Sequence, residues 1–363
     1  MAEKRIAWID FCRVYTAFCV IIRHGDRHYG SLTYIADLFN YRSLVFFFFL
    51  MAGYFTRYAP PGQLLDKARA CRLLWPYLFW TLIAALTMEP LMHLGQIAQG
   101  DWSWVSFSLL LREMGLHSWC YWDYSNVPMW FLRTLIILAL VSPLLQKLPL
   151  KAMLCFILFI FAASDVLCEA DGETAAHYRR SGWWLLPFRL YESVLALGFY
   201  SAGLLLRRYA TAEQLTSFVR QYAWLPLLGS LVLLPVVYTT GFYPPVQSSA
   251  LVLLGVCTIL SIGSLCEQYF PRFCRAVAKW GPATFFIYST HFMLLHCLRL
   301  ALTGDYSGRF TPLQDLWTPW LVLAISLALY SVLVRCCPRV MHLLALAPPC
   351  SASSKAPARP TPV

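Results

Sequence analysis

Residues 7–26 of this chain read AWIDFCRVYTAFCVIIRHGD. The stretch is apolar and long enough to cross about 30 Å of hydrocarbon as a helix, yet it contains Asp10, Arg13 and His24. Arg13 and His24 are eleven residues apart, so they lie on one helix face about 16 Å apart along its axis. Because ionisable residues inside a membrane are costly, this stretch predicts a membrane helix that carries a functional site.

The composition of the whole chain also indicates a membrane protein. Hydrophobic residues make up 59%, charged residues only 13%, and the mean hydropathy is +0.57, whereas soluble domains contain about 25% charged residues. Aromatic residues reach 16%, as interfacial aromatic belts require. The net charge of +11 does not indicate a nucleic-acid partner, because the basic residues cluster in short loops between apolar spans.

We predict an all-α, polytopic membrane helical bundle of ten transmembrane helices with both termini cytoplasmic. One transmembrane domain covers residues 1–340, and residues 341–363 form a disordered cytoplasmic tail that is rich in Pro, Ala and Ser. An amphipathic segment at 102–114 is expected to lie in the interface, and eleven spans would result if it crossed. The predicted spans are 7–26, 37–57, 72–94, 127–147, 150–169, 183–206, 222–240, 246–266, 280–302 and 317–336.

The distribution of Lys and Arg favours this topology. With ten spans and a cytoplasmic N-terminus, 18 of the 29 basic residues fall in inside segments and seven in outside segments. Such a bias follows the positive-inside rule. The seven outside residues are Arg23, Arg27, Arg112, Arg179, Arg180, Arg299 and Arg309.

Three groups of polar residues are candidates for chemistry. His24 is a plausible general base, although Arg13 snorkelling to headgroups, with His24 at the outer interface, is the structural alternative. Arg69 and Arg72 share a face near a cytoplasmic helix start and would grip a phosphate, or serve only as positive-inside anchors. Tyr288 and His291 share a face near mid-membrane depth, where packing is the alternative role. The 13 Cys lack metal-type spacing, so we predict no metal site.

These segments together resemble the membrane acyltransferase-3 family, whose members O-acylate surface polysaccharides and glycolipids. The first-helix pattern of Asp, Arg and His matches Asp10, Arg13 and His24, and the late Tyr-x-x-His matches Tyr288 and His291. The other matching segments, in the family's order, are Phe48 to Tyr54 (with Ala52 in place of Ser), Arg69-x-x-Arg72 with Pro76 and Tyr77, Trp130 to Leu132, and Ser142 to Leu144.

The resemblance implies an enzyme of the bacterial inner membrane that uses acyl-CoA, most often acetyl-CoA, as its donor substrate and no permanently bound cofactor. Its acceptor would be a saccharide or lipid-linked saccharide, in contact with membrane lipids. Arg69 and Arg72 would bind the donor, and His24, Arg13, His291 and Tyr288 would serve catalysis. His24 would act as general base or, in an alternative route, His24 or His291 would carry the acyl group, with Tyr288 as the candidate oxyanion donor. Succinyl is the chief rival acyl group.

Val14 replaces the glycine that usually follows the family's first-helix arginine. The alternative function is a multi-span transporter or lipid-linked sugar exporter with an intramembrane His and Arg relay. No inverted repeat or pair of broken helices supports it in the sequence.

Overall fold

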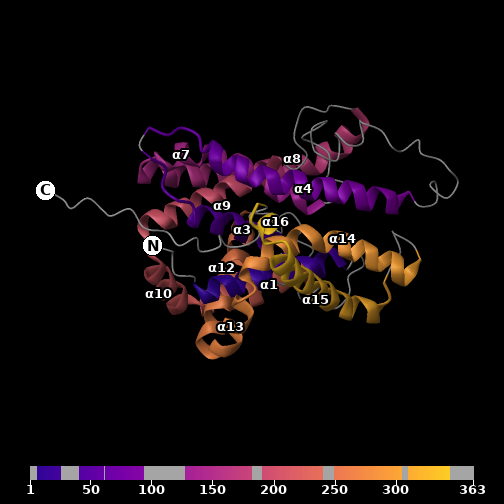
Figure 1. Ribbon diagram of the computed structural model, residues 1–363. Coiled ribbons are helices and arrows are strands. Elements are labelled where there is room, and N and C mark those ends of the chain that lie inside the picture. The colour runs from indigo at the N-terminus through magenta and orange to yellow at the C-terminus, as the bar shows by residue number, and fades with distance from the viewer. Residues whose placement is uncertain are drawn as a thin grey trace.

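The computed structural model describes residues 6–25, 41–60, 62–93, 127–181, 190–239, 249–304 and 310–343, and every regular element in these ranges is helical (Figure 1). This confirms the predicted all-helical architecture, in which each helix satisfies its own backbone polar groups. The elements are α1 (Ala7–Gly25), α3 (Tyr41–Tyr54), α4 (Lys67–Met92), η1 (Val127–Met129), α7 (Trp130–Gln146), α8 (Leu150–Ser181), α9 (Leu190–Tyr209), α10 (Ala212–Tyr222), α11 (Trp224–Thr239), α12 (Ser249–Tyr269), α13 (Pro271–Ala278), η3 (Gly281–Ala283), α14 (Thr284–Thr303), α15 (Pro312–Cys336) and α16 (Pro338–Leu343).

Each of the ten predicted spans overlaps one of these helices. Within the described residues, five helical segments are long and apolar enough to cross a membrane, and they fall in α4, α8, α12, η3 with α14, and α15. Shorter apolar helices cover Ser43–Tyr54, Trp130–Gln146 and Trp224–Leu233. The total number of spans and the side of each terminus therefore stay predictions. The interfacial segment 102–114 lies outside the described residues, and α16 carries helix three residues into the predicted tail, whose remainder is also outside them.

Helix α1 lies at the centre of the lower group of helices in Figure 1, where it contacts α3, α12, α13, α14 and α15. Its apolar side chains are buried along its whole length, from Trp8 to Ile22. Helices α3 and α9 lie between this group and the group formed by α4, α7 and α8. Of the polar residues of α1, Asp10 and Thr16 are buried, whereas Arg13, Arg23 and His24 are partly exposed.

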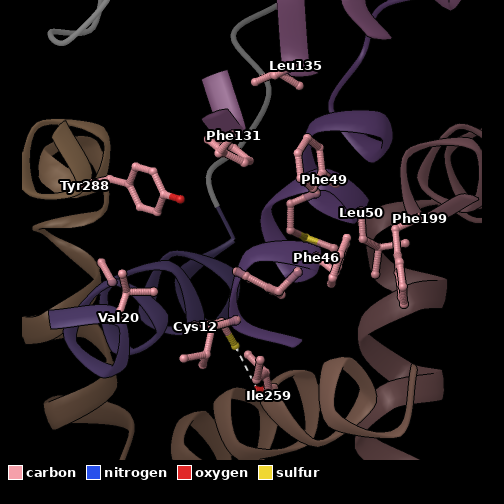
Figure 2. Packing of buried hydrophobic residues seen from close by; sticks show 14 of the residues in the cluster. Cys12, Val20, Phe46, Phe49, Leu50, Phe131, Leu135, Phe199, Ile259 and Tyr288 are labelled. Atoms are coloured by element: carbon pink, nitrogen blue, oxygen red, sulfur yellow. Dashed lines mark hydrogen bonds between the residues drawn. The ribbon is translucent and has the colours of Figure 1, made fainter. Parts of the chain in front are cut away.

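Helices α3 and α9 cross at backbone contact. A β-carbon built on Gly53 would overlap the Tyr200 carbonyl, and one on Gly203 would overlap the Leu50 carbonyl. Small residues at such a crossing let two membrane helices approach closely. The aromatic run of α3 then packs around the crossing, with the rings of Phe46 and Phe199 stacked at 5.4 Å (Figure 2).

Helix α12 approaches α1 in the same way. A β-carbon on Gly263 would overlap the Cys12 sulfur, and the Cys12 thiol donates a hydrogen bond of 3.2 Å to the Ile259 carbonyl, drawn as a dashed line in Figure 2. The other end of α12 is held by α8. The Asp165 carboxylate of α8 accepts hydrogen bonds from the Ser249 backbone N–H and from the Ser249 hydroxyl, at 2.7 and 2.9 Å. That carboxylate caps the start of α12, where the helix dipole favours negative charge.

Candidate functional site

A cavity of about 300 Å³ opens between α1, α3, α4, α7 and α14. Its wall is mainly apolar and aromatic, but two arginines, Arg13 and Arg69, also line it. Two cations beside an apolar cavity suit a ligand with an anionic end and a less polar arm. The other lining residues are Phe48, Met51, Ala52, Phe55, Phe131, Leu135, Thr284, Phe285 and Tyr288.

Arg69 is held at the cavity by polar groups from two segments, the C-terminal end of α3 with the residues after it, and α9. Its Nη1 donates to the Thr56 hydroxyl at 2.6 Å and to the Tyr200 hydroxyl at 3.4 Å, and its Nη2 donates to the Ala52 carbonyl at 3.3 Å. The guanidinium is therefore oriented before any ligand arrives. The sequence pattern could not predict this, because Thr56 and Tyr200 meet Arg69 only through the crossing of α3 and α9.

Arg72 has a different environment from Arg69. It is exposed, does not line the cavity, and donates from Nε to the Ala68 carbonyl of its own helix at 3.4 Å. The spacing of three residues in α4 places the two arginines on neighbouring positions, but only Arg69 faces the cavity.

Arg13 lies on the cavity wall in α1 and pairs with Asp10 one turn earlier, Nη1 to Oδ1 at 3.2 Å. The Arg13 side chain keeps 35% of its surface exposed, whereas the Asp10 side chain keeps 10%. The carboxylate stabilises the guanidinium and sets its direction. The two residues are three positions apart, a spacing that brings side chains together on one helix face.

Tyr288 of α14 forms another part of the cavity wall. Its ring packs against Phe131 at 5.2 Å and Phe48 at 6.0 Å between centroids, and Figure 2 shows its hydroxyl directed away from α14 toward the centre of the bundle. On its other side the ring lies 5.8 Å from the imidazole of His291. Tyr288 is thus in contact with both the cavity and the histidine.

His291 is fully buried, and its hydrogen bonding fixes its tautomer. Nδ1 lies 3.1 Å from the Ile287 carbonyl oxygen, while Nε2 has no hydrogen-bond partner in the part of the chain that the structure describes. A carbonyl only accepts, so Nδ1 carries the proton and Nε2 presents a lone pair. A buried nitrogen in that state is able to accept a proton or a hydrogen bond.

His24 is the neighbour of His291 across the interface between α1 and α14. The two ring centroids are 5.2 Å apart, and the His24 ring also meets Phe292 edge-on at 5.5 Å. His24 is half-buried whereas His291 is enclosed. The structure therefore brings together two histidines that are 267 positions apart in the sequence.

Five of the six residues singled out in the sequence, all except Arg72, belong to one connected arrangement. Arg13, Arg69 and Tyr288 line the cavity, Tyr288 contacts His291, and His291 contacts His24. The arrangement therefore has two guanidinium groups at one end and two imidazoles at the other, with the aromatic ring of Tyr288 between them. It provides an anion-binding end and a proton-handling end, which are the requirements of group transfer from a charged donor to a hydroxyl.

Arg299 is a further polar residue near this arrangement. The sequence assigns Arg299 to the basic residues of the outside segments, but in the structure its side chain is buried in α14. Its Nη2 donates to the His24 carbonyl at 2.9 Å and to the Gly25 carbonyl at 2.7 Å. No sequence signal points to this role, because Arg299 counts among the outside charges and its partners are known only from the fold.

A family model describing an acyltransferase domain, acyltransferase 3, matches residues 6–335, which is nearly the whole chain. No curated protein and no solved structure matches this sequence. The matched range contains every residue of the cavity and both histidines.

Proposed function

This chain belongs to the acyltransferase-3 family, and from that premise we propose that it is a membrane O-acyltransferase. The donor is acyl-CoA, with acetyl as the first acyl group to test and succinyl as the second. The acceptor is a hydroxyl of a surface polysaccharide, or of a lipid-linked saccharide, at the cell membrane. The observation that supports the proposal is a cavity that Arg13, Arg69 and Tyr288 line together. The Tyr288 ring in turn contacts His291, whose ring contacts His24.

The donor end of the reaction is assigned to the two arginines. Coenzyme A carries phosphates, and guanidinium groups form strong charge-assisted hydrogen bonds with them. Arg69 is held by neutral partners, the Thr56 hydroxyl and the Ala52 carbonyl, so its positive charge is available to an anion. The apolar wall between Phe48 and Tyr288 suits the less polar arm and the thioester.

The acceptor end is assigned to His24, since it is the half-buried member of the pair. An alcohol is a weak nucleophile at neutral pH, so His24 removes its proton as the oxygen attacks the thioester carbonyl carbon. The carbon–sulfur bond then breaks, and coenzyme A leaves as the thiol after taking the proton from the imidazolium. The Tyr288 hydroxyl is assigned to donate to the carbonyl oxygen while that oxygen carries negative charge.

The Nε2 lone pair of His291, which meets no hydrogen-bond donor among the described residues, is available beside His24. In this proposal the His291 Nε2 lone pair stabilises the proton that His24 has taken from the acceptor hydroxyl, until that proton passes to the leaving thiol. His291 as a covalent acyl carrier is the competing route, in which the acyl group resides on Nε2 before it reaches the acceptor. Trapping with radiolabelled donor and no acceptor separates the two, because only the carrier route labels the protein.

The experiment that tests the function is transfer of labelled acetyl from acetyl-CoA into surface glycan. Wild type is compared with His24→Ala at matched membrane levels, with His93→Ala at the end of α4 as the histidine control. We expect label with wild type and the control, and none with His24→Ala. If wild type gives no label, the assay is repeated with labelled succinyl-CoA as the donor. If the purified protein consumes neither donor, the transporter alternative is favoured. Equal label in wild type and His24→Ala would remove His24 from the reaction.

A further inference from the structure

The end of α1 is tied to α14 by a side chain for which the reaction scheme above has no use. Nη2 of Arg299 bridges the His24 and Gly25 carbonyls at 2.9 and 2.7 Å, across 275 and 274 positions of sequence. The last carbonyls of a helix have no partners within it. Gly25 is itself buried, and among the described residues its carbonyl accepts this hydrogen bond from the Arg299 guanidinium.

The burial of Arg299 makes its role informative. Only 2% of the residue is exposed, and its guanidinium carbon lies 5.4 Å from the ring centroid of Phe310. A buried cation within an apolar span is costly, so such residues are retained for a specific interaction. The negative end of the α1 dipole, together with two carbonyl oxygens, supplies that interaction.

Arg299 belongs to a stripe on α14 that faces the end of α1. His291, Leu295 and Arg299 follow one another at intervals of four residues, which places them along one face of the helix. The His291 ring lies beside the His24 ring, and the Leu295 side chain is 3.7 Å from where a β-carbon on Gly25 would stand. Arg299, the last of the three, donates hydrogen bonds to the His24 and Gly25 carbonyls.

We propose that Arg299 is a positioning residue: its guanidinium fixes the last turn of α1 and thereby holds the His24 imidazole beside His291. The inference rests on the proposed acyl-transfer function and extends it to a residue that does not contact the donor cavity. An error of about 1 Å in the placement of a catalytic group costs up to about 100-fold in rate. Loss of the bridge should therefore lower kcat and leave donor binding unchanged.

The chain contains a matched control for this bridge. Arg208 of α9 donates from Nη1 to the Leu148 carbonyl at 2.7 Å and from Nη2 to the Gln146 carbonyl at 2.9 Å. It therefore holds the end of α7 by the same chemistry, but it is exposed and lies outside the cavity wall. A general cost of losing an arginine bridge should appear equally in both variants.

The experiment compares Arg299→Gln, Arg299→Lys and Arg208→Gln at matched levels of folded protein. Arg299→Gln should lower kcat by about 10- to 100-fold with KM for acyl-CoA within about two-fold of wild type. Arg299→Lys retains a cation that can donate to both carbonyls, so it should recover part of the loss. Arg208→Gln should keep the wild-type kcat. If Arg299→Gln does not reach the membrane, the same comparison is made with Arg299→Lys.

A second measurement reads the position of His24 without requiring turnover. Carbethoxylation of individual histidines by diethyl pyrocarbonate is followed by mass spectrometry in intact membranes. We expect faster modification of His24 in Arg299→Gln and no change in Arg208→Gln. An unchanged His24 rate together with an unchanged kcat overturns the inference, as does an equal loss of kcat in Arg208→Gln. A wild type that turns over no acyl donor refutes the proposed function instead, and the His24 rate still decides the positioning role.

Discussion

The imidazoles of His24 and His291 lie 5.2 Å apart between ring centroids, inclined by 47°, on helices from opposite ends of the chain. One ring is half-buried, and the other is fully enclosed with an Nε2 that has no hydrogen-bond partner among the described residues. This difference in burial is the basis on which the proposed mechanism gives the two histidines distinct roles.

We expect His291→Gln to lower kcat by about 100-fold, because positioned acid–base groups contribute at least that factor. KM for acyl-CoA should change little, since His291 does not line the cavity. The control is His296→Gln, which alters another buried histidine of α14 and should retain activity. Wild-type kcat in His291→Gln would exclude His291 from proton handling.

Arg69→Ala should raise KM for acyl-CoA by about 10- to 100-fold, the equivalent of losing a hydrogen bond to a charged group. Arg72→Ala should raise it much less, because Arg72 is exposed and faces away from the cavity. Initial rates over a range of acyl-CoA concentrations provide the comparison.

Thr56→Val is the control for Arg69, since it removes the partner hydroxyl at 2.6 Å and keeps the guanidinium. It should lower the melting temperature with a smaller effect on KM. Equal KM changes in Arg69→Ala and Arg72→Ala would mean that general charge at the membrane surface attracts the donor.

Tyr288→Phe keeps the ring that packs on Phe131 at 5.2 Å but loses the hydroxyl. Loss of an oxyanion donor costs about 100- to 1,000-fold in kcat, and we expect an effect of this size with little change in KM. Tyr330→Phe, at a buried tyrosine of α15 outside the cavity wall, is the matched control. A wild-type rate in Tyr288→Phe would assign the oxyanion contact to another donor.

Gly53→Ala should destabilise the protein by about 1–3 kcal/mol, because the new methyl group meets the Tyr200 backbone at the crossing of α3 and α9. The free energy of unfolding in detergent, measured by denaturant titration, checks this value. Gly229→Ala is the control, since its methyl would lie at 3.4 Å from a flexible Leu254 side chain. Equal stability of the two variants would contradict the close crossing.

The predicted orientation can be tested with the native cysteines and a membrane-impermeant maleimide. Cys336 and Cys337 at the end of α15 are exposed, and with a cytoplasmic C-terminus they should be labelled in inside-out vesicles and protected in intact cells. Cys274 of α13 should stay unlabelled at pH 7 in both, because burial raises the pKa of its thiol to about 12 and the thiolate is the reactive form. Labelling of Cys336 in intact cells would reverse the topology.

The sequence alone determined the class of the fold and singled out the candidate site residues. Hydrophobic runs long enough to span a bilayer leave the backbone only the helix for satisfying its hydrogen bonds, so ten helical positions could be predicted from composition. The same apolar background made Arg13, His24 and His291 conspicuous, because buried ionisable groups are expensive. Helix periodicity further gave the pairing of Asp10 with Arg13 within one turn.

Only the tertiary structure decided which of these residues meet. The spacing of Arg69 and Arg72 predicts one shared face, but the crossing of α3 with α9 supplies Thr56 and Tyr200 to Arg69 alone. The approach of His24 to His291, and the bridge from Arg299 to the end of α1, join segments more than 260 positions apart. Local periodicity fixes the direction of a side chain on its own helix, whereas its partner depends on how small residues and aromatic rings pack between helices.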